Sequence, residues 1–177
     1  MSERFFQSVA ALAVALSGSA ALAASEACTP LPGGFQFCPE DTAWADAEVI
    51  PFSNGVAFDL PPYWLEVMEP PAEIAAAPSL DAALEALAEL VAEQARNEGL
   101  EAPEIMDRGA FTAGALEAVT LTTRIDLPED DPMIFVSMIA GQGDARLFVS
   151  LDDENEDAAD VAQELRRIAG LFSLIEE

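Results

Sequence analysis

The sequence contains no histidine and no lysine, so its only basic side chains are seven arginines. Without histidine, neither a Ser-His-Asp triad nor a histidine-ligated zinc site can form. Without lysine, the chain has no Schiff-base nucleophile and no lysine-containing phosphate-binding loop. These absences exclude several large enzyme classes and leave carboxylates as the only plentiful reactive groups.

Long apolar runs are also scarce, and the one that is present lies at the N-terminus. Arg4 supplies a positive charge, residues 5–16 are mostly apolar, and Ala21-Leu22-Ala23 has the small-x-small form that signal peptidase cleaves. The run is shorter than the roughly 20 residues that a resident membrane helix needs. We therefore expect residues 1–23 to be a signal peptide cleaved after Ala23. The mature protein is then expected in the periplasm or secreted, without membrane insertion.

Cysteine is limited to Cys28 and Cys38, which follow the predicted cleavage site closely. In an oxidising compartment two neighbouring cysteines usually pair. Closing so short a loop removes about 2–3 kcal/mol of entropy from the unfolded chain. We therefore expect a disulfide that ties down an N-terminal lead-in, residues 24–47, ahead of a single domain at 48–177. A redox motif would instead place two residues between the cysteines and a helix after them.

Acidic residues dominate the charge of the chain. There are 33 acids against 7 basic residues, which gives a net charge of −26. Such a surface repels nucleic acid phosphates and anionic lipid headgroups, so we expect no nucleic acid partner. Two interpretations remain open. The acids are a solubility adaptation whose self-repulsion salt screens, or they form a surface for divalent cations or a basic protein.

Hydrophobic periodicity predicts an α+β domain with a mostly antiparallel β-sheet and helices packed on it. A stripe of leucines behind the N-cap residue Ser79 predicts a helix that stops at Gly99. A second stripe from Val161 to Ile175 predicts a helix near the C-terminus. Apolar alternation or β-branched runs predict strands at 35–37, 48–52, 56–60, 63–68, 105–106, 116–125, 133–140 and 145–151.

The stretch LDDENEDAAD, residues 151–160, is the most acidic part of the chain. Asp153, Asn155 and Asp157 have the first half of a calcium loop's spacing, and Glu164 stands at its twelfth place. The sixth place is Ala158, however, where such a loop turns sharply and needs glycine. These residues are therefore candidate ligands of a low-affinity cation cluster only, and we expect no metal site.

The helical stripe gives the same stretch another role. Because the helix must already run before Val161, the acids preceding it lie near the positive end of the helix dipole. Asp152, Asp153 or Asn155 is expected to supply the N-cap. We therefore interpret the stretch as the acidic start of a helix.

Tyr63 and Trp64 are the candidate binding surface, because amphipathic aromatic residues are enriched in binding hot spots. The alternative is that Trp64 packs against the sheet under the first helix. The strand arginines Arg108, Arg124 and Arg146 are expected to pair with local carboxylates rather than to bind an anionic ligand.

Paired carboxylates can hydrolyse glycosides when one of them has a raised pKa. Nothing in their spacing selects two partners here, and the chain offers few aromatic residues for stacking on sugars. The candidates for such a pair are Asp59, Glu66, Asp107, Glu117 and Asp126. We expect no cofactor.

The segment GVAFDLPPYW, residues 55–64, resembles the opening hairpin of PsbP/DcrB-like domains. The order of the later elements and the closing LFSLI at 171–175 are also similar to that family, over residues 48–176. The resemblance implies an α/β/α sandwich around an antiparallel sheet. It also implies an accessory protein that binds partners, since family members are mostly non-enzymatic. It carries over no catalytic or metal-binding residue, because the histidines that bind metal in some members have no counterpart here.

These features together predict an exported accessory or binding protein without catalytic activity, whose partner is a protein in the cell envelope. One alternative is a low-affinity binder of divalent cations or of a cationic partner through the acidic surface. The other is a small carboxylate hydrolase.

Overall fold

Alternating apolar side chains build one large antiparallel sheet, as the sequence predicts. The computed structural model describes residues 28–127, 132–153 and 157–175. Within them, seven strands follow the order β3-β4-β5-β9-β8-β7-β6, and each strand is antiparallel to its neighbours. The strands are β3 (Glu48–Phe52), β4 (Gly55–Leu60), β5 (Tyr63–Met68), β6 (Glu104–Ala113), β7 (Leu116–Ile125), β8 (Met133–Gln142) and β9 (Ala145–Asp153).

A small second sheet joins the two ends of the described chain. It has the order β1-β2-β10 and is also antiparallel. A disulfide between Cys28 and Cys38 closes the β1–β2 hairpin, which confirms the predicted pair. The elements are β1 (Thr29–Pro30), β2 (Phe35–Phe37) and β10 (Phe172–Leu174), with short 3-10 helices η1 (Pro32–Gly34) and η2 (Ala43–Asp46).

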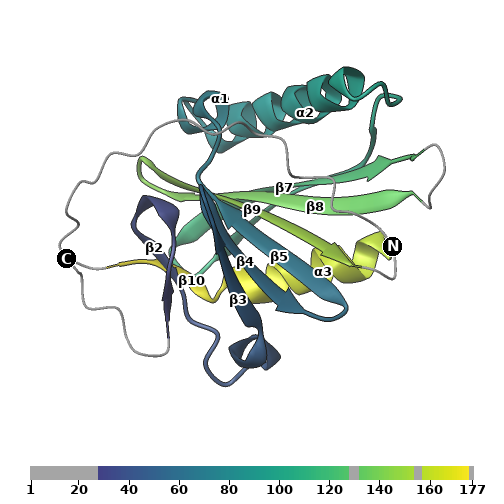
Figure 1. The fold of residues 1–177 in the computed structure, drawn as a ribbon. Coiled ribbons are helices and arrows are strands. Elements are labelled where there is room, and N and C mark those ends of the chain that lie inside the picture. Colours follow the sequence, from purple (N-terminus) through teal and green to yellow (C-terminus); the bar gives the residue numbers. More distant parts are fainter. Residues whose placement is uncertain (1–27, 128–131, 154–156, 176–177) are drawn as a thin grey trace.

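Helices lie on both sides of the large sheet (Figure 1). The helix α2 (Leu80–Asn97) packs over β7 and β8, with the short α1 (Ala72–Ala75) beside it. The helix α3 (Ala158–Ala169) packs against β8 and β9 on the opposite face. This arrangement is the α/β/α sandwich that the family resemblance implies. None of the described helices combines the length and the apolar character needed to cross a membrane.

Each face of the sheet has its own apolar core. The smaller core lies under α2 and includes Leu87, Leu121 and Ile139, all almost fully buried. The larger core lies under α3. It takes in side chains from the lead-in, since Phe35, Phe37 and Trp44 are at most 1% exposed. Residues 28–47 therefore fold as part of the same unit as the large sheet.

The strand β6 is longer than the sequence predicts. We expected a strand only at 105–106, whereas β6 pairs with β7 from Glu104 to Ala113. The register shifts between Ile105 and Asp107, which marks a bulge. As an edge strand that is largely exposed, β6 buries few apolar side chains and so lacks the alternation by which a strand is recognised.

The C-terminal helix begins later than predicted. Its N-cap is Asp157, whose Oδ1 accepts hydrogen bonds from the backbone N–H groups of Ala159 and Asp160, at 2.9 and 3.3 Å. The prediction that Asp152 or Asp153 caps the helix is wrong, because both residues belong to β9. The third candidate, Asn155, lies outside the described residues. An aspartate at the helix N-cap still explains part of the acidic stretch.

The same helix also ends earlier than predicted, because it stops at Ala169 and Gly170 follows as its C-cap. The prediction that the helix continues to Ile175 is wrong. Phe172–Leu174 instead form β10, which pairs with β2. Phe172 is buried in the larger core, so its place in the apolar stripe reflects burial and not helical structure.

Candidate functional site

Tyr63 and Trp64, the predicted binding residues, lie on opposite faces of the sheet. They are consecutive in β5, and successive side chains of a strand point to opposite sides. Tyr63 packs against the larger core on the α3 side. Trp64 therefore points to the side on which α1 and α2 lie. The two aromatic residues do not form one surface, and each side needs its own description.

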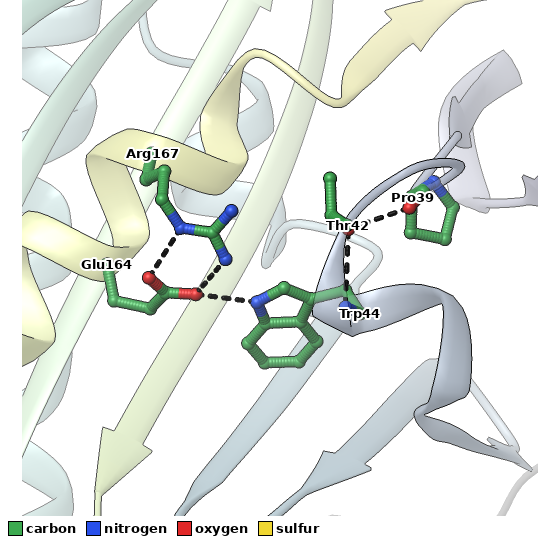
Figure 2. A network of polar contacts seen from close by, with 5 residues as sticks. All are labelled: Pro39, Thr42, Trp44, Glu164 and Arg167. Carbon is green, nitrogen blue, oxygen red and sulfur yellow. Dashed lines mark hydrogen bonds and ion pairs between the residues drawn. The ribbon is translucent and has the colours of Figure 1, made fainter.

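On the α3 side, a network of polar contacts fastens the lead-in to α3 (Figure 2). Tyr63 packs beside this network. Its ring stacks on the indole of Trp44, with the ring centroids 6.2 Å apart. The Trp44 Nε1–H donates to Glu164 Oε1 at 2.6 Å. Arg167 binds both oxygens of the same carboxylate. Its Nε donates to Oε2 at 2.7 Å, and its Nη2 donates to Oε1 at 2.5 Å. The two ends of the described chain are thus joined by side chains as well as by the small sheet.

A local turn places the Trp44 indole for this contact. The Thr42 hydroxyl donates to the Pro39 carbonyl at 2.7 Å and accepts from the Trp44 backbone N–H at 3.2 Å. Thr42 therefore acts as the N-cap of η2 (Figure 2). The indole is 1% exposed, so its Nε1–H needs an internal acceptor, which Glu164 supplies.

The electrostatics of the network favour a charged Glu164. Its hydrogen bond from Arg167 lowers the pKa of the carboxyl below the ordinary value, and the bond from Trp44 lowers it further. Partial burial raises the pKa, but the hydrogen bonds lower it by more. Glu164 raises the pKa of Arg167 in turn. A carboxylate held ionised in this way is unsuited to be a general acid, and we interpret the network as a structural anchor.

On the other side of β5, Trp64 belongs to a part of the sheet that lies beyond α2. In the described chain, α2 packs on β7 and β8, and Trp64 is not among the side chains of the core beneath it. The described residues thus do not place Trp64 in the core under α2, the helix predicted from Ser79 to Gly99. Cross-strand register defines the surface around it, which we call the Trp64 face: Glu48, Ile50, Ala57, Asp59, Trp64, Glu66, Ser150 and Asp152, of which Ala57 is 1% exposed.

The Trp64 indole lies in a row of carboxylates that crosses four strands. Glu48 is paired with Asp59, Asp59 with Trp64, and Trp64 with Asp152. The indole Nε1–H donates to Glu66 Oε1 at 2.9 Å, two residues along the same strand and on the same face. Glu48 is exposed, and the other four side chains are half-buried. The face thus combines an oriented aromatic ring with several negative charges.

The arginines of the strands lie elsewhere. Arg108 forms an ion pair with Glu85, and Arg124 pairs with Asp126 at 3.0 Å, so the prediction of local carboxylate partners is confirmed for both. It is wrong for Arg146, whose Nη1 donates to backbone carbonyls within its own hairpin. The Arg146 side chain lies over Gly141, where an added Cβ would come within 2.7 Å of Nη1.

The carboxylates considered for hydrolysis come from several elements of the fold. Asp107 is on β6, Glu117 is near the start of β7, and Asp126 follows β7. Glu117 lines a cavity of about 800 Å³ beside the N-terminus of α2, which the other four do not line. Asp59 and Glu66 share the Trp64 face, where Glu66 accepts the hydrogen bond of the indole.

The described calcium-loop residues belong to different elements of the fold. Asp157 caps α3, while Asp153 ends β9 and Asn155 lies outside the described residues. Glu164 is bound to Trp44 and Arg167. Across the described ranges, no three or more histidine, cysteine, aspartate or glutamate side chains lie together so that they could hold a metal ion.

Sequence signals account for some of these residues and not for others. Trp64 was identified from its amphipathic aromatic character. Nothing local marks Trp44 and Glu164 as partners, since they are 120 residues apart. Asp59 and Glu48 could have been identified from the strand alternation together with the Ser53-Asn54 turn, because a two-residue hairpin sets the register of its strands.

Comparison with known proteins shows the fold. No protein-family model matches the sequence, and no curated protein matches it. The solution structure of cyanobacterial PsbP (CyanoP) from Synechocystis sp. PCC 6803 matches with a TM-score of 0.54 and 17% identity, over 89% of this chain and 98% of that one. The crystal structure of PA94 from Pseudomonas aeruginosa, a protein of unknown function, has a TM-score of 0.42 and 14% identity, over 76% and 87% of the two chains. The match to CyanoP shows that the chain has a PsbP-like fold, as the resemblance of GVAFDLPPYW predicts.

Proposed function

We propose that this protein is an exported accessory protein that has no catalytic activity and binds a protein partner in the cell envelope through the Trp64 face. The observation that carries the proposal is a half-buried tryptophan on a part of the sheet that α2 does not cover. Tryptophan is among the residues most enriched in binding hot spots. Its indole is also held by Glu66, which reduces the entropy that binding would cost.

The residue types and their placement support a non-catalytic role. The chain has neither histidine nor lysine. Glu164, the carboxylate whose pKa is lowered, is held by Arg167 and Trp44 as an anchor. Of the five carboxylates considered for hydrolysis, Asp107, Glu117 and Asp126 lie on or beside β6 and β7, and Asp59 and Glu66 share the Trp64 face, where Glu66 accepts the hydrogen bond of the indole. A PsbP-like fold agrees with this role, because the family resemblance implies accessory proteins that bind partners.

The disulfide supports export, because such bonds form and persist in oxidising compartments. Cell fractionation followed by intact mass spectrometry tests this part. We expect the protein in the exported fraction, starting at Ala24 and two hydrogens lighter than its reduced form. A full-length chain with free thiols in the cytoplasm would contradict it.

Affinity capture from an exported-compartment extract tests the binding role. Wild-type protein is compared with Trp64→Ala and with Met106→Ala, a control that removes an exposed apolar side chain from the distant edge strand β6. We expect a partner to be retained by the wild type and by Met106→Ala and to be lost with Trp64→Ala. Equal capture by all three would contradict the proposed face. Hydrolysis of a glycan that is abolished by Asp59→Asn would contradict the absence of catalysis.

A further inference from the structure

We propose that the group which binds the Trp64 face is a basic side chain, lysine or arginine, carried by the partner protein. This inference rests on the proposed function and adds the chemistry of the partner. Three observations support it. The face carries a pair of like charges and an aromatic ring beside them, and the strands that build this pair contain no arginine.

The like charges are Glu48 and Asp59, which are directly opposite each other on β3 and β4. Cross-strand carboxylates repel, so this pairing destabilises the hairpin when nothing lies between them. In the part of the chain that the structure describes, no arginine forms an ion pair with either carboxylate. A single positive charge placed over the pair would relieve the repulsion.

The aromatic ring is the next member of the same row, because Asp59 is opposite Trp64. Tryptophan attracts cations to its ring face more strongly than the other aromatic side chains do. Asp152 is opposite Trp64 on the other side, so carboxylates stand on both sides of the indole. A cation bound at the ring would therefore interact with the ring and with carboxylates at the same time.

The strands that carry Glu48 and Asp59 supply no positive charge of their own. The segment 48–68, which includes β3, β4 and β5, contains no arginine, and the chain contains no lysine. The face also has apolar surface, since Ile50 and the indole are half-buried. The aliphatic stems of lysine and arginine pack on such surface while their charged ends reach polar groups.

An organic cation fits this face better than a metal ion does. A hard metal such as calcium takes six to eight oxygen ligands in a closed shell. No set of three suitable ligands lies together among the described residues. Two carboxylates beside a flat ring instead match a planar guanidinium or an ammonium group.

The test uses the disulfide-bonded protein and two peptides, one of alternating arginine and glycine and one with citrulline in place of arginine. Citrulline keeps the shape of arginine and removes its charge. The two tryptophans give two indole N–H signals in an NMR spectrum, so that Trp44, which is buried and bound to Glu164, is an internal control. We expect the arginine peptide to shift the Trp64 signal and to leave the Trp44 signal in place. The citrulline peptide should shift neither signal.

Charge-matched variants separate this site from the overall charge of the protein. Glu48→Gln/Asp59→Asn removes two charges from the face, and Glu89→Gln/Glu93→Gln removes two from the exposed side of α2. We expect the first variant to weaken peptide binding by about three- to tenfold and the second by less than about twofold. Thermal unfolding of both variants shows whether each is folded.

Several results would overturn the inference. These are no shift of Trp64 with the arginine peptide, an equal shift with citrulline, equal weakening by both double variants, or a Trp64 shift that saturates at micromolar calcium. A change in the Trp64 signal with protein concentration alone would indicate a second copy as the occupant. If Trp64→Ala loses the captured partner while the arginine peptide has no effect, the proposed function stands and this inference fails.

Discussion

At Gly55, the β3–β4 hairpin leaves no room for a side chain. Gly55 lies opposite Phe52, and an added Cβ would come within 2.2 Å of the Val67 carbonyl oxygen and 2.9 Å of the Phe52 ring. We expect Gly55→Ala to lower the free energy of unfolding by about 1–3 kcal/mol, because overpacking forces the neighbouring strand to move. Urea unfolding measures the change. Gly170→Ala is the control, since a Cβ there meets no atom within 4 Å. Equal effects of the two substitutions would contradict this explanation.

Glu164 is the residue at which pH is expected to act on stability. Since its folded pKa lies below the ordinary value, the charged form stabilises the folded state above that ordinary value. The stabilisation is lost as pH falls through the folded pKa. We expect Glu164→Gln to reduce the free energy of unfolding at pH 7 by about 1–3 kcal/mol, because charge-assisted hydrogen bonds are lost.

The loss of stability caused by Glu164→Gln is expected to depend on pH. The difference between the wild type and Glu164→Gln should be constant from pH 6 to 7 and should shrink below roughly pH 4, near the ordinary pKa of glutamate. Denaturant unfolding at several pH values measures it. Glu89→Gln, on the exposed side of α2, is the control for loss of one charge. A difference that grows as pH falls would contradict the assignment.

At the scale of elements, the β1–β2 hairpin depends on its disulfide. The hairpin carries Phe35 and Phe37 into the larger core and provides the strand with which β10 pairs. We expect Cys28→Ser/Cys38→Ser to lower the free energy of unfolding by about 2–3 kcal/mol, as the unfolded chain regains loop entropy. Chemical denaturation of the double variant measures the loss. Reductant should have the same effect on the wild type and none on the variant. A reduced wild type as stable as the oxidised protein would contradict the role.

The elements also differ in how far the sequence predicted them. The helix from Leu80 was predicted almost to the residue, because Ser79 caps it and its apolar stripe faces one core. The central strands β7 and β8 were predicted because β-branched and other apolar residues run through both. The edge strand β6 and the change from helix to strand at Gly170 were not. The exposed strand β6 lacks the apolar alternation that marks a strand, and β10 pairs with β2, which is so distant in the sequence that the pairing leaves no local pattern.

At the scale of the whole molecule, the net charge of −26 sets a dependence on salt. Like charges spread over one small surface repel, and salt reduces the Debye length from about 30 Å at 0.01 M to about 3 Å at 1 M. We expect the melting temperature to rise as sodium chloride is increased over this range. Differential scanning calorimetry measures it, with tetramethylammonium chloride as the control for a sodium-specific effect. A melting temperature that is unchanged or falls would show that self-repulsion does not limit stability.

By itself, the sequence determined the fold class, the disulfide pair, the main helix and the exclusion of histidine- and lysine-dependent chemistry. Each of these depends on composition or on neighbours a few residues apart, which one chain displays directly. Only the tertiary structure decided that Tyr63 joins the core on the α3 side, that Glu164 holds Trp44, and that carboxylates from separate strands stand beside one indole. The physical reason is that these contacts join residues brought together by strand register and helix docking, and neither is encoded in any single segment.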